Sequence, residues 1–339
     1  MKVTLIGLPQ AGQQQLFCLL TGISLDNVLQ KPTEPHLGIC EVKDPRITRL
    51  QTMYHPQKTT YAKIEFLLLP DLNFQSQQKD LLINQLKNAD EICLVVKQQD
   101  AVAEIQNFIS ELIIFDLMLI EKRLQTIEKE KFKKADPQKE KDLLEKCKNA
   151  LDQEKLLSAL PFDNEQKKAL RAYQFFTLKP MAIVINVPED KINDQSQSSQ
   201  IKAKYNLPAI QVSAELEEEI SRLEESEKTE FMRELGIEEP AIHKMTRVVF
   251  EGLGLISFFT VGEDEVRAWP IPKGSLAPEA GSTIHTDIAK GFIRAEMMKY
   301  TDLIEAGAEN KLKETGRFYL KGKDYVVEDG DILSFRFNV

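Results

Sequence analysis

The chain has 339 residues, of which 42% are hydrophobic and 29% are charged, and its formal net charge is −9. This composition is typical of a soluble globular protein, and at roughly 150 residues per domain the length indicates two or three domains. The negative net charge excludes a generic polyanion binder, so any contact with nucleic acid requires a local basic patch.

Short apolar runs separated by helical patterns extend through the first 190 residues. Four of these runs, 3–7, 63–70, 90–97 and 180–187, have the length and character of buried parallel strands. The segment QQQLFCLLTG, which follows the first run, is compatible with a helix. Strands that alternate with helices predict an α/β fold with a mainly parallel sheet.

Residues 102–175 have a different pattern. Apolar residues recur at helical spacing from Ile105 to Ile127, ADPQ (135–138) interrupts the pattern, and residues 139–160 resume it. Two long helices around a proline-containing turn predict an antiparallel helical hairpin. Its faces rich in Lys and Glu fit either a solvated surface, which we favour, or a surface for a partner.

The last third of the chain changes character twice. Residues 214–236 form a strongly acidic helical pattern that ends at Gly236. After about residue 255, short β-type runs alternate with Gly and Pro turns, and VEDGDILSFRF contains an Asp-Gly turn that predicts a β-hairpin. We therefore expect a small α+β domain at the end of the chain.

Cysteine usage and hydropathy bear on the cellular compartment. Cys18, Cys40, Cys93 and Cys147 lie far apart without CxxC spacing, which indicates a reducing compartment and no zinc site. No apolar run approaches the ~20 residues that span a bilayer. Lys2 leads into a short strand rather than a signal peptide, so we expect a cytoplasmic protein without a membrane contact.

The stretch GLPQAGQQQLF (7–17) raises the main functional question. Gly7 and Gly12 have the G-x-x-x-x-G spacing of a phosphate-binding loop. In such a loop backbone N–H groups surround phosphate oxygens, a Lys contacts the β- and γ-phosphates, and a Ser or Thr hydroxyl holds Mg²⁺. Gln13 and Gln14 stand at these last two positions. The glycine spacing alone is not specific.

The C-terminal third carries a specific resemblance. Residues 267–296 and 322–339 closely resemble the TGS region of the YchF family of Obg-related P-loop NTPases. LEKCKNAL (144–151) and residues 169–190 resemble the helical insert of that family and the strand that follows it. The likeness covers nearly the whole chain. It implies a Ras-like P-loop domain with an inserted helical hairpin, followed by a TGS domain of the β-grasp type. The implied domains are 1–100 with 176–254, 101–175, and 255–339.

The resemblance also implies a base-recognition site. NVPE (186–189) matches the N-x-x-E that the family uses in place of the N-x-x-D of true GTPases. Asn186 would bind the purine edge, and Glu189 would fit adenine at least as well as guanine. Ser213, in VSAE (212–215), would line the base. The alternative is that Asn186 only caps the end of a strand.

The phosphate-binding motifs depart from the family pattern. Gln13 replaces the Lys by a neutral amide, and Gln14 is a poorer Mg²⁺ ligand than a hydroxyl. Charge-assisted hydrogen bonds are roughly twice as strong as neutral ones, so we expect triphosphate affinity to fall and catalysis to fall further.

The switch regions depart in the same direction. Leu68 stands where the family has the Asp of Asp-x-x-Gly, and Asp71 stands where it has the Gly, although Asp71 could still contribute a metal contact. Pro32 replaces the Thr of the first switch, with Thr33 beside it. FQSQQKDLL (74–82) contains neither Gly nor His, whereas many members have a catalytic His there.

Five changes that remove the same charge and metal contacts predict lost hydrolysis. We therefore expect a pseudo-NTPase without catalytic or metal-binding residues, which binds ATP or GTP weakly or not at all. The alternative is a weak ATPase or GTPase with residual hydrolysis. The resemblance implies a ribosome or another RNA–protein complex as partner, and we expect no DNA contact. The candidate residues for contact with RNA are Lys273, His285, Lys290 and Arg294.

Overall fold

The computed structural model describes residues 1–73, 79–129 and 137–338. Contacts divide the chain into two compact units. The first unit contains Met1–Gly38 and Glu65–Met245, and the second contains Ile39–Ile64 and Thr246–Val339. Residues 39–64, which the sequence places in the P-loop domain, thus group with the C-terminal residues. The division into three functional domains stays a prediction.

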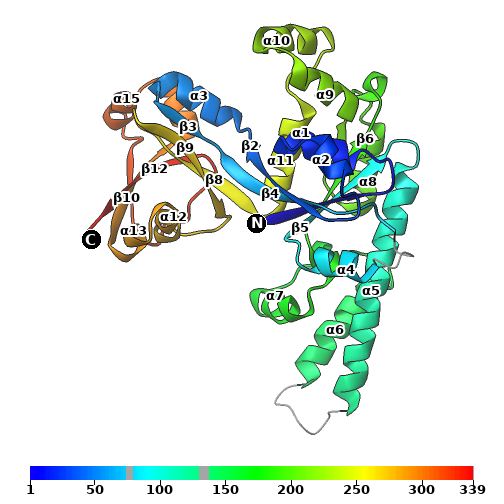
Figure 1. Cartoon of the computed structure of the whole chain (residues 1–339). Helices are drawn as coiled ribbons and strands as arrows, with labels where there is room; N and C mark the ends of the chain where they lie inside the picture. The colour runs from blue at the N-terminus through cyan, green and yellow to red at the C-terminus, as the bar shows by residue number, and fades with distance from the viewer. Residues whose placement is uncertain (74–78, 130–136, 339) are drawn as a thin grey trace. The chain divides into compact units, whose positions relative to one another are not determined.

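A six-stranded sheet lies mainly in the first unit, while its residues 39–42 and 62–64 group with the second (Figure 1). Its order is β2 (His36–Val42), β4 (Ala62–Leu68), β1 (Lys2–Gly7), β5 (Glu91–Lys97), β6 (Met181–Asn186), β7 (Ala209–Val212). Strand β1 pairs in parallel with β4 and β5, and β6 pairs in parallel with β5 and β7. The four predicted strands are therefore confirmed. Because parallel strands share one carboxyl edge, the loops after β1, β4 and β6 lie at that edge.

Helices complete the first unit. They are α1 (Gln13–Thr21), α2 (Leu25–Leu29), α4 (Lys79–Lys87), α5 (Ala101–Lys129), α6 (Pro137–Leu151), α7 (Asn164–Leu170), α8 (Ser196–Tyr205), α9 (Ala214–Arg222), α10 (Glu225–Glu234) and the start of α11 (Ala241–Gly252). One hydrophobic core joins strand residues such as Leu94 and Ile183 to the buried face of α5, which includes Ile105 and Leu112. Within the described part of the chain, no helix has the length and apolar character of a membrane span.

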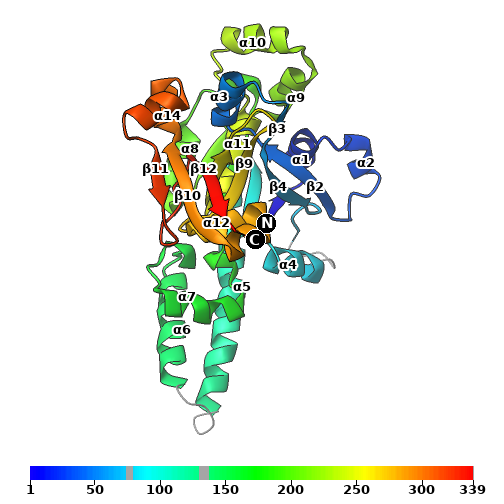
Figure 2. The ribbon, with the colours of Figure 1, turned by 90° about the vertical axis from the view of Figure 1, so that its left-hand side faces the viewer.

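Helices α5 and α6 run side by side in opposite directions (Figure 1, Figure 2). Arg123, late in α5, pairs with Glu140, early in α6, and Glu121 pairs with Lys148 further along; both distances are 2.7 Å. The second helix ends at Leu151 rather than at residue 160 as predicted. The chain turns at Glu154, whose φ of 57° is incompatible with a right-handed helix.

A buried carboxylate fixes the chain that follows these helices. Asp116 of α5 accepts hydrogen bonds from the backbone N–H groups of Phe176 and Thr177, at 3.0 and 2.8 Å, and from the Thr177 hydroxyl at 2.7 Å. Burial raises the pKa of Asp116 to about 6, against the opposing effect of these donors. Sequence periodicity gave no sign of this contact because Asp116 occupies an ordinary core position of a helix.

The acidic segment 214–236 forms two helices instead of one. Leu223 is extended, with φ −77° and ψ 150°, and separates α9 from α10. The Glu224 backbone N–H donates to the Glu227 carboxylate at 3.2 Å, which starts the second helix. The single predicted helix was wrong because Leu and Glu are good helix formers, so local preference gave no reason for a break.

A second six-stranded sheet lies in the second unit (Figure 1). Its order is β11 (Tyr319–Lys321), β10 (Phe292–Lys299), β12 (Asp331–Phe337), β8 (Leu255–Thr260), β9 (Glu265–Pro272), β3 (Lys58–Thr60). The helices of this unit are α3 (Pro45–Tyr54), the end of α11, α12 (Ala277–Ile284), α13 (Thr286–Lys290), α14 (Tyr300–Ala306) and α15 (Glu309–Glu314). An α+β character was predicted for this part and is observed.

Two pairings in this sheet differ from expectation. The Asp-Gly turn at residues 329–330 does not close a hairpin, because β12 pairs with β10 in antiparallel and with β8 in parallel orientation. The predicted hairpin was therefore wrong. Strand β3 adds to the edge of the sheet in parallel with β9, which explains why residues 39–64 group with this unit.

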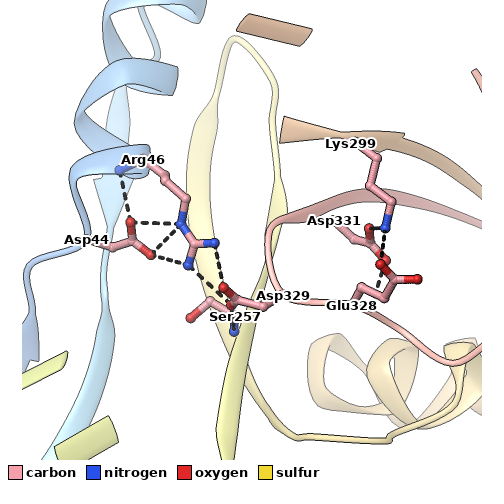
Figure 3. Close-up of polar contacts among 7 residues, drawn as sticks. All are labelled: Asp44, Arg46, Ser257, Lys299, Glu328, Asp329 and Asp331. Atoms are coloured by element: carbon pink, nitrogen blue, oxygen red, sulfur yellow. Dashed lines mark hydrogen bonds and ion pairs between the residues drawn. The ribbon is translucent and has the colours of Figure 1, made fainter. Parts of the chain in front are cut away.

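Ion pairs fix residues 39–64 within the second unit (Figure 3). The Arg46 guanidinium lies 2.7 Å from Asp44 and 2.7 Å from Asp329, and Asp329 also accepts from the Ser257 backbone N–H at 2.9 Å. The Arg46 guanidinium thus connects α3 to the turn before β12. On the other side of this turn, Lys299 pairs with Asp331 at 2.6 Å.

Candidate nucleotide site

Residues 7–14, which we call the glycine loop, connect β1 to α1. Gly12 has φ 94° and ψ 7°, a left-handed conformation that favours glycine. A Cβ atom on Gly12 would lie 2.3 Å from the Asn186 Nδ2 atom. A Cβ atom on Gly7 would lie 2.9 Å from the Val95 carbonyl oxygen. Backbone conformation and close packing therefore both require glycine at position 12, and close packing requires it at position 7.

The side chains of Gln13 and Gln14 point to a common acceptor. Gln13 is fully buried, and its Nε2 donates to Asp71 Oδ1 at 2.6 Å and, at a longer 3.4 Å, to the Gly7 carbonyl oxygen. Gln14 Nε2 donates to the same Asp71 oxygen at 3.0 Å. The structure thus brings together three of the positions at which the sequence departs from a phosphate-binding site. We call Gln13, Gln14 and Asp71 the phosphate end.

The electrostatics of the phosphate end are opposite to those of a working loop. Both side-chain donors to Asp71 are neutral amides, which do not balance the carboxylate charge. A phosphate in the same region would meet a negative charge in place of a lysine and a metal ion. A cation does lie at the loop: Lys97, at the end of β5, donates to Gln10 Oε1 at 3.3 Å. Sequence reasoning missed Lys97, whose position depends on β5 lying beside β1.

On another side the loop contacts Asn186, which in turn contacts the start of α9; we call Asn186, Ser213 and Ala214 the base end. Asn186 Nδ2 donates to the Ala11 carbonyl oxygen at 3.0 Å, and Asn186 Oδ1 accepts from the Ala214 backbone N–H at 3.1 Å. The buried Ser213 caps α9, because its hydroxyl accepts from the Leu216 backbone N–H at 3.4 Å. Glu189 lies in a short exposed turn after β6.

The first-switch residues lie near Gln14 but offer little to a metal ion. Gln14, Pro32, Glu34, His36 and the buried Leu68 line a cavity of ≈10 Å³, about the space of a single water probe. Within the described residues, no group of three His, Cys, Asp or Glu side chains could hold a metal ion.

Two further predictions concern the switches. Thr33, considered as a substitute for the first-switch Thr, is exposed. In the segment 74–82, residues 74–78 lie outside the described residues, and α4 begins at Lys79.

Comparisons with known proteins cover the whole chain. A ribosome-binding ATPase YchF from Bacillus subtilis is 36% identical over 99% of this chain and 98% of its own length. The ribosome-binding ATPase YchF from Haemophilus influenzae is 35% identical over 100% of this chain and 99% of its own length. The chain belongs to the YchF family.

Two further comparisons agree with this family assignment. The YchF family model for the C-terminal region, described as a protein of unknown function (DUF933), matches residues 255–338. The solved structure of the Schizosaccharomyces pombe YchF GTPase has a TM-score of 0.84 and 25% identity, and it covers 99% of this chain and 97% of that chain. The predicted α/β fold is thereby confirmed.

The four candidate RNA contacts of this YchF-family chain fall into different local settings. Lys273 lines a cavity of ≈290 Å³ in the second unit, together with Arg46, and Arg294 is exposed on β10. His285 and Lys290 share one neighbour, Asp287: the His285 Nδ1 atom accepts from its backbone N–H at 3.2 Å, and Lys290 Nζ lies 3.8 Å from its carboxylate. A nearby acid lowers the positive potential at these two positions.

Proposed function

We propose that this chain is a ribosome-associated, cytoplasmic binding module whose nucleotide site does not hydrolyse nucleotides. Full-length similarity to relatives named as ribosome-binding ATPases supports the ribosome as partner. The observation that carries the second half of the proposal is the hydrogen bonding of Gln13 and Gln14 to Asp71.

Phosphoryl transfer depends on positioning and on neutralisation of the charge that develops on the phosphate oxygens. In this site the residue at the lysine position is a neutral amide that already donates to a carboxylate. The residue at the metal-hydroxyl position donates to the same carboxylate. Leu68, at the position of the metal-binding Asp, is buried and has no oxygen to offer on its side chain. These features support binding without catalysis.

We assign the partner surface to the parts of the chain outside the glycine loop. Helices α5 and α6 would be the inserted helical hairpin of the family, and residues 255–339 its TGS domain. Lys273 and Arg294 are the strongest candidate contacts with ribosomal phosphates, because they are exposed and do not share Asp287 as His285 and Lys290 do.

Co-sedimentation with ribosomes at low and high salt tests the proposal. We expect association without added nucleotide, with little change when Mg²⁺ and ATP or GTP are present. Lys273→Glu with Arg294→Glu should weaken it at least about tenfold, because each lost phosphate contact reduces affinity and the salt dependence. The exposed pair Lys63→Glu and Lys202→Glu is the charge-matched control. Association that requires a nucleoside triphosphate, or equal losses in both double variants, would refute this assignment.

A weak ATPase or GTPase is the competing candidate, and two contacts favour it. Asn186 keeps the loops of the base end connected, and Lys97 places a positive charge at the glycine loop. This candidate predicts Mg²⁺-dependent turnover that Asn186→Ala and Lys97→Ala both reduce.

A further inference from the structure

Asp71 is the one anionic side chain of the phosphate end, and it approaches the glycine loop from the end of β4. Both of its contacts come from the residues that would hold the β- and γ-phosphates and the metal in a working site. The loop that carries Asp71 is itself fixed, since the Leu72 backbone N–H donates to the Gly7 carbonyl oxygen at 2.8 Å. The carboxylate is therefore held beside the first turn of α1 by side-chain and backbone contacts.

The start of α1 retains donors that Asp71 does not use. No side chain caps the helix at Gly12, and the first N–H groups of an α-helix have no partner inside the helix. Gly12, which precedes these groups, is left-handed, and uncapped N–H groups at a helix start favour an anion. In addition, Gln13 Oε1 is buried without a hydrogen-bond partner and lies next to Gly7. The start of α1 thus has backbone donors without a side-chain cap, whereas the side-chain donors of Gln13 and Gln14 already bind Asp71.

We propose that Asp71 is a specificity-determining residue that takes the place of a terminal phosphate. The site then accepts a nucleoside diphosphate, rejects the corresponding triphosphate, and gains nothing from Mg²⁺. The inference rests on the proposed function, because it assumes that the base end still receives a purine. Beyond the proposed function, the inference states that a diphosphate fits the site better than a triphosphate and that Asp71 determines this preference.

The physical reason is repulsion at short range. A terminal phosphate directed at Gln13 and Gln14 would have to displace the Asp71 carboxylate or lie beside it, and like charges at hydrogen-bonding distance repel. A diphosphate ends one phosphate earlier and can use the backbone N–H groups at the start of α1. Magnesium ordinarily bridges the β- and γ-phosphates, so a ligand without a γ-phosphate loses little when Mg²⁺ is absent.

Asp71→Asn is the informative variant. Asparagine has the same shape and keeps an oxygen that accepts from Gln13 and Gln14, but it carries no charge. Asp152→Asn, in the turn after α6, is the matched control because it removes one exposed negative charge away from the glycine loop. Thermal unfolding of each variant verifies that the fold is retained.

Isothermal titration calorimetry with ADP, ATP, GDP and GTP, each with and without Mg²⁺, tests the proposal. For the wild type and Asp152→Asn, we expect the preferred diphosphate to bind at least about tenfold more tightly than its triphosphate, with no gain from Mg²⁺. Asp71→Asn should bring the two affinities to within about threefold of each other, mainly by strengthening triphosphate binding.

Three results would overturn the inference. They are a wild-type preference for the triphosphate, a preference for the diphosphate that Asp71→Asn leaves unchanged, and no binding of any of the four nucleotides at millimolar concentration. If Mg²⁺ strengthened binding and Asp71→Asn abolished that gain, Asp71 would be a metal ligand instead. The proposed function fails by different observations, namely hydrolysis or lack of ribosome association, so the two failures can be distinguished.

Discussion

The two ends of the glycine loop are held by similar hydrogen bonds but differ in charge. At the base end, Asn186 connects Ala11 to Ala214 through both atoms of its amide. At the phosphate end, two glutamine amides bind the carboxylate of Asp71. At the base end stands the Asn that the family resemblance implies, whereas at the phosphate end a neutral pair and an anion stand where that resemblance implies a cation and metal ligands. The two ends therefore differ in the charge that they present to a ligand, although both are joined to the loop by hydrogen bonds.

The two ends also differ in how completely their polar groups are satisfied. Both polar atoms of the Asn186 amide have partners. Gln13 is fully buried, yet its Oε1 has no partner, and a buried unsatisfied acceptor costs about 1–3 kcal/mol. The base end thus contributes to the stability of the fold, whereas the phosphate end is partly unfavourable.

The largest effect is expected when the phosphate end is restored. In the triple variant Gln13→Lys, Gln14→Thr and Asp71→Gly, the cation and hydroxyl return and the competing carboxylate is removed. Its affinity for a Mg²⁺–triphosphate should exceed that of the wild type by at least about a hundredfold, or ~2.7 kcal/mol, as measured by calorimetry. Equal affinities would mean that the difference between the two ends lies elsewhere in the site.

Gly12→Ala should be the most destabilising single change in the loop. It combines left-handed backbone strain with the 2.3 Å contact to Asn186, the residue of the base end. Gly22→Ala is a close control, because Gly22 has φ 72° and ψ 7° and no atom within 4 Å of the added Cβ. We expect a loss of about 1 kcal/mol for Gly22→Ala and about 3 kcal/mol or more for Gly12→Ala in urea unfolding. Equal losses would show that Asn186 does not restrain the loop.

A pair of substitutions compares the two ends directly. Asn186→Ala removes two satisfied hydrogen bonds and should lower the free energy of unfolding by about 2 kcal/mol. Gln13→Met has a similar shape and removes the Nε2 hydrogen bonds to Asp71 and Gly7, but it also removes the buried oxygen without a partner. These two effects oppose each other, so the net change should stay within about 1 kcal/mol of zero. Chemical denaturation measures both. If Gln13→Met proved the more destabilising, the assignment of a partly unfavourable phosphate end would be wrong.

The last prediction is a pH dependence, and it concerns helix α9, which begins at the base end. Glu217 of α9 is buried and accepts from the Ala241 backbone N–H at 2.7 Å. Burial raises the pKa of Glu217 from its ordinary 4.5 to about 7. Between these values the folded chain keeps a proton that the unfolded chain has released, so the free energy of unfolding falls as pH rises through this window.

Glu217→Gln removes this titration. We expect the decrease in the free energy of unfolding from pH 5 to pH 7 to be smaller in the variant, by on the order of 2 kcal/mol. Asp116, whose pKa is raised to about 6, contributes in the same direction in both proteins. The exposed neighbour Glu219→Gln is the control. A pH dependence that is the same in all three proteins would contradict the burial effect.

The sequence predicted the features that local pattern determines. The four apolar runs became parallel strands because buried strands need continuous apolar residues. Gly7 and Gly12 marked the loop because a side chain at Gly7 would meet the Val95 carbonyl oxygen and because Gly12 is left-handed. The replaced residues Gln13, Gln14 and Asp71 were also recognised. What the sequence could not provide was their mutual contact, since Gln13 and Asp71 are 58 residues apart and meet only because β4 lies beside β1.

The other differences have the same origin in tertiary structure. The Asp-Gly turn before β12 has the local signature of a hairpin, but pairing with β10 and β8 decides the topology. Residues 39–64 join the second unit through β3 and through Arg46, and neither contact leaves a periodic pattern. The hydrogen bond from the Ala241 backbone N–H to Glu217 likewise joins residues that are distant in sequence.

The measurement that tests the central claim most directly is steady-state hydrolysis of ATP and GTP with Mg²⁺, in the absence and presence of ribosomes. The wild type should release no phosphate above the background of its Asn186→Ala variant, because its phosphate end holds Asp71 rather than a cation and a metal. A Mg²⁺-dependent rate that ribosomes stimulate and Asn186→Ala abolishes would contradict this account and identify the chain as an active NTPase.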